Sequence, residues 1–279
     1  ARDRKPSAPH DRGPPAQTCS SSCSYRLHLL RSWSLRQTRR GSDRGLAKRL
    51  RMLRAWHAMR RFTELTGARF AQETLYQAIF DSALRALKVD APPFYAAKSG
   101  ANYSLLYSLL RSVTETPAKR ILEIGAGQTS LLLNTLKQIR PDLQITSLET
   151  DPDWRDWIAN RVDHAVLHSS LSRQIIEGVE VKGFFDLSGL QGKTFDLVLV
   201  DGPPGAQKRN ARWAVLPILR NHLAGEFLVI FDDAERSGEQ DTIKQFARSC
   251  DNSVDHGLTV GTKGQIMLFT PAYRAAKYF

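Results

Sequence analysis

Along residues 117–279, two patterns of apolar and polar positions alternate. Short apolar runs, typical of buried strands, are separated by longer segments in which apolar residues recur every three or four positions, as in amphipathic helices. The runs predict strands at residues 120–124, 144–148, 164–168, 195–200 and 227–231. The segments between them predict helices at 129–139, 154–162, 211–222 and 242–248, with Pro217 kinking or breaking the third of these.

Two parts of this region depart from the alternation of strands and helices. Within residues 170–193 we expect some helix near 173–177, followed by a glycine-bearing loop. Near the C-terminus, strands at 254–260 and 265–270 flank Gly261-Thr262-Lys263-Gly264, which predicts a hairpin turn. Alternating strands and helices favour an α/β fold with a Rossmann-like, doubly wound sheet. The sheet is expected to be mostly parallel, with an antiparallel strand from the C-terminal hairpin.

Helical periodicity also precedes the sheet region. It predicts a basic amphipathic helix at 46–65, a helix at 70–88 that ends before Pro92-Pro93, and a helix at 103–113 that ends before Pro117. We therefore divide the chain into a basic leader (1–45), N-terminal helices on the lid or substrate side (46–116), and a ligand-binding α/β domain (117–279).

Charge is distributed unevenly along the 279 residues. The formal net charge is +12, yet residues 1–61 hold sixteen of the 40 Lys and Arg and three of the 28 acids. The leader is therefore basic, and the remainder is nearly neutral. The leader is open to several interpretations: a tail for nucleic acid or a membrane surface, a transit-like presequence, or sequence upstream of a start at Met52 or Met59. We favour the last, or plain disorder, and do not expect a nucleic-acid partner.

Cysteine usage and hydropathy place further bounds. Cys19, Cys23 and Cys250 do not make a disulfide framework, and a reducing compartment such as the cytoplasm fits them. No stretch reaches the roughly 18 apolar residues needed to span a bilayer. We therefore expect no transmembrane segment.

The first candidate for chemistry is a glycine turn after the strand at 120–124. Residues 121–130 read Ile-Leu-Glu-Ile-Gly-Ala-Gly-Gln-Thr-Ser, an apolar run that enters a helix through Gly125 and Gly127. Such a turn lets the backbone approach a ligand, and the helix behind it offers unpaired N–H groups. A dinucleotide fingerprint would place a third glycine at Ser130.

The pattern acid-x-Gly-x-Gly-x-Thr, from Glu123 to Thr129, resembles motif I of the class I S-adenosylmethionine (SAM) dependent methyltransferases. The resemblance implies that Gly125, Ala126, Gly127 and Thr129 wrap the methionine part of SAM, with Glu123 close by. It also implies a sheet whose last strand inserts between the fifth and sixth. A strand-to-helix turn without a ligand is the alternative.

Two further positions follow strands in the same way. Glu149 comes directly after the second strand, 22 residues past Gly127, where an acid would accept hydrogen bonds from ribose hydroxyls. It resembles the family's motif II, although enzymes that use NAD place an acid there too. Ser169 follows the third strand, where the resemblance implies proximity to the adenine ring; a plain loop is an equal alternative.

Acids end the fourth and fifth strands. Asp201 begins Asp-Gly-Pro-Pro-Gly, and Asp232-Asp233 follow the fifth strand. Three carboxylates with open positions suit Mg²⁺, which would acidify and orient an acceptor hydroxyl. The trio is similar to the metal site of catechol-type and sugar O-methyltransferases and of the plant glucuronoxylan methyltransferases, although catechol-type enzymes usually have Asn where Asp233 stands. Exposed loop acids or helix N-caps are the alternative. Without a metal, a carboxylate such as Asp201 or the amine of Lys208 would be the general base.

Together these features predict SAM-dependent methyl transfer to a hydroxyl of a sugar, glycan or other small hydroxylated acceptor, with Mg²⁺ as a possible cofactor. Two other classes remain open: an NAD(P)-dependent oxidoreductase, and a non-catalytic protein that binds nucleic acid through its basic leader.

Overall fold

The computed structural model describes most of the chain beyond its N-terminal quarter, in four stretches: residues 67–96, 100–205, 209–250 and 254–279. All of these stretches belong to the second of the two units into which the chain divides, residues 62–279. The expected leader and the expected helix at 46–65 lie outside the described residues. No described helix is long and apolar enough to cross a membrane.

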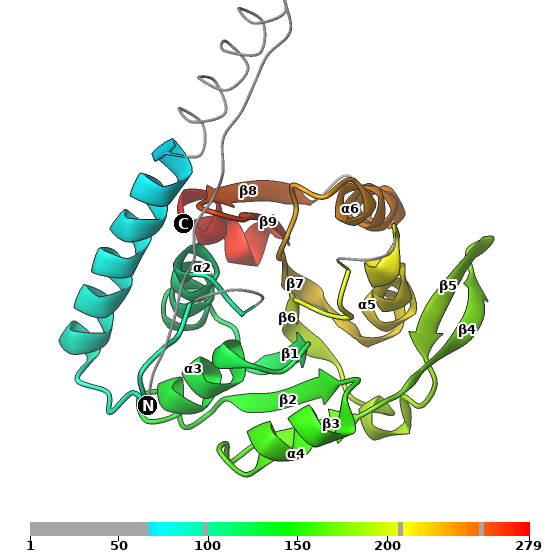
Figure 1. Cartoon of the computed structure of the whole chain (residues 1–279), viewed down its shortest axis with the longest axis horizontal. Coiled ribbons are helices and arrows are strands. Elements are labelled where there is room, and N and C mark those ends of the chain that lie inside the picture. Colours follow the sequence, from blue (N-terminus) through cyan, green and yellow to red (C-terminus); the bar gives the residue numbers. More distant parts are fainter. Residues whose placement is uncertain (1–66, 97–99, 206–208, 251–253) are drawn as a thin grey trace, which may run out of the picture. The chain divides into compact units, whose positions relative to one another are not determined.

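A seven-stranded sheet forms the centre of the second unit, in the order β3-β2-β1-β6-β7-β9-β8 (Figure 1). Its strands are β1 (Arg120–Ile124), β2 (Gln144–Glu149), β3 (Ala165–His168), β6 (Phe195–Val200), β7 (Leu223–Phe231), β8 (Asp255–Val260) and β9 (Gly264–Phe269). The pairs among the first five are parallel, whereas β9 runs antiparallel to both β7 and β8. The last strand is thus inserted between its predecessors, which confirms the expected Rossmann-like sheet with an antiparallel C-terminal strand.

Helices cover both faces of this sheet because neighbouring strand residues point to opposite sides. Leu197 and Leu199 of β6 pack with a helix at residues 67–87 and with α2 (Tyr103–Thr114), α3 (Gln128–Leu136) and η3 (Pro271–Tyr278). Val198 and Val200 face the other core, which contains η2 (Ala211–Val215), α5 (Leu216–His222) and α6 (Ser237–Ser249). The two N-terminal helices therefore share a core with the sheet. Near the β3 edge, α4 (Pro152–Ala159) buries Ile158.

The expected helix near 173–177 is wrong. This segment forms a separate two-stranded antiparallel hairpin, β4 (Leu171–Ile176) and β5 (Val179–Phe184). Glu177 and Gly178 connect the strands with φ angles of 51° and 78°, and two consecutive positive φ values match the twist of a tight hairpin. β-Branched Ile175 and Ile176 before such a turn favour strand over helix.

Pro217 breaks the expected helix at 211–222, as predicted. The 3₁₀ turn η2 ends at Val215, and α5 starts at Leu216 with Pro217 in its first turn. Proline is tolerated there because the first helical N–H groups have no partner within the helix. The break matters for the site, because η2 carries Arg212.

Candidate functional site

The carboxyl ends of four strands meet along one edge of the sheet. Each parallel ladder continues one residue past the strand: Gly125 N donates to Leu148 O, and Asp201 N donates to Ile124 O, both at 2.9 Å. Asp232 N likewise donates to the backbone oxygen of Val200 at 3.0 Å. The residues that follow β1, β2, β6 and β7 are therefore held side by side, as expected for a ligand site in an open α/β sheet.

A cavity of about 900 Å³ opens at this edge, within the range of small-molecule and cofactor sites. Most of the candidates from the sequence line it, namely Gly125, Ala126, Gly127, Thr129, Glu149, Asp201 and Asp233. Glu123, Ser169 and Asp232 are not among the described residues that line it. Lys208 lies outside the described residues, so its role as a base stays a prediction.

The two glycines of the turn differ in their surroundings. A Cβ on Gly125 would lie 2.9 Å from the backbone of Asp201 and Gly202, and its φ is +94°, a conformation that side chains disfavour. Gly125 is thus required by the close approach of the two loops. A Cβ on Gly127 would meet nothing within 4 Å, and Gly127 lines the cavity. Gly127 is therefore the glycine that leaves room for a ligand.

Glu123 lies beneath this turn, fully buried. Its carboxylate accepts hydrogen bonds from Thr129 Oγ1, from Ser130 Oγ at 2.5 Å and from Ser147 Oγ at 2.5 Å. Burial raises the pKa of Glu123 to about 7, although these hydroxyl donors oppose the shift. Ser130 Oγ also accepts from Gly127 N at 2.9 Å, so the residue at the third glycine position of the dinucleotide fingerprint caps the helix.

Glu149 is buried at the end of β2 and reaches the same turn. Its Oε1 accepts from Thr150 N at 2.6 Å, Asp151 N at 2.9 Å and Thr150 Oγ1 at 3.2 Å. Its Oε2 accepts from Ala126 N at 3.0 Å. A carboxylate oxygen has about two lone-pair sites, so Oε2 retains acceptor capacity on the cavity side.

Two residues near the β2–β3 edge make contacts that the sequence did not predict. Ser169 is buried, and its hydroxyl accepts from Asp186 N at 3.0 Å, which ties the end of β3 to the chain after β5. Trp154 of α4, which the sequence did not single out, lines the cavity and donates from Nε1 to Ala126 O at 2.8 Å. Its ring stacks on Trp157, with ring centres 4.8 Å apart.

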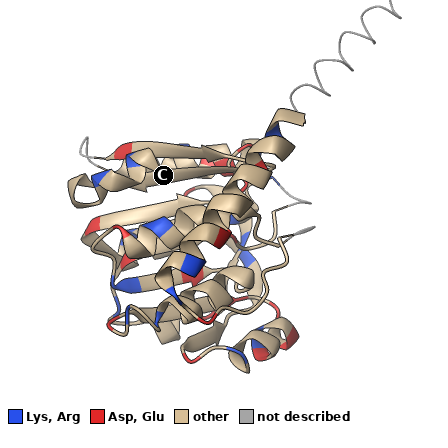
Figure 2. Cartoon of the chain, turned by 90° about the vertical axis from the view of Figure 1, so that its left-hand side faces the viewer, with Lys and Arg blue, Asp and Glu red and all other residues tan. Residues whose placement is uncertain are grey.

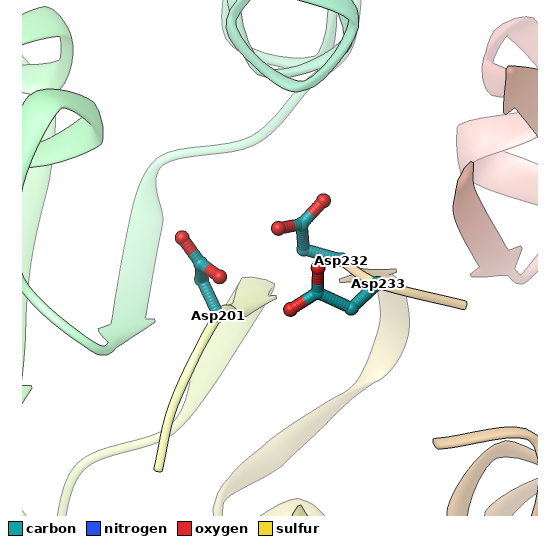
Figure 3. A group of neighbouring side chains, drawn as sticks. All are labelled: Asp201, Asp232 and Asp233. Carbon is teal, nitrogen blue, oxygen red and sulfur yellow. The ribbon is translucent and has the colours of Figure 1, made fainter. Parts of the chain in front are cut away.

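The acid trio comes together as the sequence predicts. Asp201, Asp232 and Asp233 each place one carboxylate oxygen within 4.8 Å of the others (Figure 3). Asp233 has a φ of 56°, which is uncommon for a residue with a side chain but tolerated by Asp. This bend lets adjacent Asp232 and Asp233 both contribute to the cluster.

Two cations that sequence reasoning missed, the buried Arg212 and the partly buried Lys263, already contact these carboxylates. Arg212 Nη2 lies 2.6 Å from Asp233 Oδ2 and 3.2 Å from Asp201 Oδ1. Lys263 Nζ lies 2.9 Å from Asp232 Oδ2 and 3.5 Å from Asp233 Oδ1. Mg²⁺ would require several of these oxygens at about 2.0–2.1 Å, facing the metal and free of competing cations. The trio has the spacing for a divalent ion, but its charge environment does not fit one.

Burial and the charges around the trio shift the pKa values of Asp201 and Asp232 in opposite directions. Burial, followed by the negative charge of Asp232, raises the pKa of Asp201 well above its usual range. Burial acts in the same direction on Asp232, but Lys263 and Arg212 outweigh it and hold the pKa of Asp232 below its usual value. Asp201, which lines the cavity, is thus the carboxyl of this pair that gives up its proton at the higher pH.

The sequence carries a weak signal for Arg212 and none for Lys263. Arg212 interrupts the apolar run Ala211-Arg212-Trp213-Ala214-Val215, and a charge in such a run needs a buried partner. Lys263 sits in a turn, where lysine is ordinarily solvated. Only the inserted position of β9 brings that turn to the ends of β6 and β7.

No protein-family model matches the chain, and no curated protein matches it. Several solved structures are similar to it. They include a methyltransferase from Pyrococcus furiosus (17% identity, 72% of this chain and 98% of that chain, TM-score 0.44). The O-methyltransferase TomG from Streptomyces achromogenes, in complex with SAM, shares 16% identity over 74% of this chain and 98% of its own, with a TM-score of 0.44. An O-methyltransferase from Bacillus cereus in complex with SAH shares 16% identity over 76% and 96%, with a TM-score of 0.40.

Proposed function

We propose that this chain is a SAM-dependent methyltransferase that acts on a hydroxyl oxygen. The observation that carries the proposal is the pairing of Gly127 and Glu149 at one cavity. Gly127 leaves open space where any side chain would intrude, and Glu149 Oε2 keeps acceptor capacity beside it. A ligand with a flexible chain next to a ribose satisfies both features.

In this arrangement the methionine part of SAM lies along the turn from Gly125 to Gly127. The ribose then lies at Glu149, where one hydroxyl donates to Oε2. The positive end of the α3 helix dipole favours a negatively charged group nearby, such as the methionine carboxylate. These placements agree with the roles that the resemblance to motifs I and II implies.

The acceptor binds on the Asp201 side of the cavity. When the acceptor oxygen attacks the methyl carbon, the new O–C bond forms as the S–C bond breaks, and SAH is the second product. The hydroxyl proton passes to the carboxylate of Asp201, which acts as general base. Because the pKa of Asp201 is raised, this carboxylate is a stronger base than an ordinary aspartate.

A hydroxylated acceptor, such as a sugar, a glycan or another small hydroxylated compound, suits the polar groups on this side. Asp233, Arg236 and Lys263 line the cavity with Asp201 and can orient hydroxyl groups. The magnesium predicted from the trio does not enter this proposal, because Arg212 and Lys263 contact the same oxygens.

The two alternative classes have less support. A nicotinamide-dependent enzyme would be expected to end in a further parallel strand, whereas β9 is antiparallel, and Ser130 takes the third glycine position. The nucleic-acid alternative depends on the basic leader, which lies outside the described residues, and it stays a prediction. Among the described residues, basic and acidic positions are interspersed in the view of Figure 2.

Calorimetry with SAH and with NAD, on the same protein sample, tests the proposal. We expect saturable binding of SAH and none of NAD, and an acceptor screen with radiolabelled SAM would follow. Binding of NAD without binding of SAH would overturn it.

A further inference from the structure

The acid trio receives its countercharge from the protein itself. Arg212 and Lys263 reach the trio from two different elements. Arg212 comes from η2, and Lys263 comes from the turn between β8 and β9. Their side chains are 3% and 15% exposed, so water screens these ion pairs little.

Arg212 is fixed between the ends of β6 and β7. Besides the two carboxylates, its guanidinium donates to the backbone oxygens of Val200 at 3.4 Å, Asp201 at 3.3 Å and Asp232. A planar group that bonds to both strand ends cannot withdraw without removing a donor from the backbone oxygens of Asp201 and Asp232 and a cation from two carboxylates. Arg212 is therefore a permanent member of the cluster.

Lys263 is held by contacts on both sides of its turn. Its Nζ donates to Gly100 O at 3.3 Å, and its neighbour Thr262 donates from the backbone to Glu73 Oε2 at 2.9 Å. The same Glu73 carboxylate accepts from Ser104 N at 3.2 Å at the start of α2. The helix at 67–87 thus anchors the turn that delivers the ammonium group.

The cluster already holds nearly as many cations as carboxylates. The three carboxylates of the trio face Arg212, Lys263 and also Arg236, whose Nη1 lies 2.8 Å from Asp233 Oδ2. Glu239 Oε1 lies 3.9 Å from both Arg212 and Arg236, so four carboxylates face three cations. A divalent cation added to this set would leave an excess of buried positive charge, which is costly. For the ion to coordinate Asp232 and Asp233, Lys263 would have to leave.

We infer that the ammonium group of Lys263, with the guanidinium group of Arg212, takes the place of a divalent cation in the acid cluster. The inference rests on the proposed function in one respect: it implies that the proposed methyl transfer proceeds without a metal ion. Lys263 is the member that keeps the ion out, because it pairs with Asp232 Oδ2 and with Asp233 Oδ1. Arg212 and Arg236 pair with the other oxygen of Asp233, Oδ2.

Titration with Mn²⁺, followed by calorimetry and by electron paramagnetic resonance, tests this directly on the full chain. We expect no saturable binding to the wild type at millimolar Mn²⁺. Lys263→Ala, and Lys263→Gln as a second variant that preserves a polar side chain, should each gain at least about tenfold in Mn²⁺ affinity. The matched control is Lys277→Ala, which removes an exposed lysine 2.8 Å from Asp255 and should gain nothing.

Three results would overturn the inference: tight Mn²⁺ binding by the wild type, no gain in both Lys263 variants, or an equal gain in Lys277→Ala. Methyl transfer by the wild type should also persist in excess EDTA. The metal titration requires no SAM, so the two proposals can fail separately. If the wild type binds neither Mn²⁺ nor SAH, the proposed function is contradicted and this inference is not.

Discussion

Substituting alanine at each glycine of the turn separates a ligand-facing position from a packing position. Gly127→Ala adds a methyl group to open space within the cavity, at a residue with an extended φ of 176°. We expect a change in unfolding free energy of no more than about 0.5 kcal/mol, the usual range for a position without contacts. Gly125→Ala introduces a side chain at a φ of +94°, with its Cβ 2.9 Å from two backbone segments.

The magnitudes follow from these surroundings. For Gly125→Ala, backbone strain alone costs about 1–3 kcal/mol, and the collision with Asp201 and Gly202 adds to it. A loss of about 2 kcal/mol corresponds to a fall in Tm of about 4–8 °C for a domain of this size. For Gly127→Ala, the methyl group occupies ligand space, and overpacking costs about 1–3 kcal/mol. This cost weakens SAH binding about 5- to 150-fold.

Thermal unfolding without ligand and calorimetry with SAH measure the two effects independently. We expect Gly127→Ala to keep the wild-type Tm and to bind SAH more weakly, whereas Gly125→Ala should have a lower Tm. Wild-type SAH affinity in Gly127→Ala would show that the ligand does not pass along the turn. An unchanged Tm in Gly125→Ala would refute the close approach of the two loops.

Two further predictions concern buried carboxyl groups. If Asp201 is the base, kcat rises with pH through its raised pKa, and Asp201→Asn lowers kcat by at least about 100-fold; an unchanged rate in this variant, with SAH still bound, would assign the base elsewhere. The folded-state pKa of Glu123, about 7, lies above the ordinary glutamate value of 4.5, so the folded state retains a proton that the unfolded chain loses. Stability should therefore be greatest below pH 4.5 as far as Glu123 contributes, and should fall by about 3 kcal/mol as the pH rises to about 7. Denaturant titrations at several pH values across this range should show that the unfolding free energy of Glu123→Gln depends less on pH than that of the wild type. An identical pH dependence would count against the raised pKa of Glu123.

Local patterns were sufficient to predict most of the fold. Buried apolar runs located all five parallel strands, and Pro217 marked the break before α5, because these features depend on the chain within a few residues. The hairpin of β4 and β5 was missed because Ile175-Ile176 is too short an apolar run to distinguish strand from helix. What settles it is the turn at Glu177-Gly178, whose two positive φ values the sequence alone does not display.

The site was predictable only where its residues follow strands. Glu149 and the acid trio could be placed because parallel strands bring their carboxyl ends to one edge. The partners of the trio could not, because Lys263 reaches Asp232 only through the antiparallel placement of β9, far along the chain. The division of work between Gly125 and Gly127 likewise depends on the loop after β6, which approaches only one of them.

The proposed function requires SAM to bind in the cavity at the glycine turn. Isothermal titration of the protein with SAH, beside a parallel titration with NAD, tests it most directly. We expect saturable binding of one SAH per chain, weakened by Gly127→Ala and retained in excess EDTA. Absence of SAH binding, or binding of NAD instead, would contradict it.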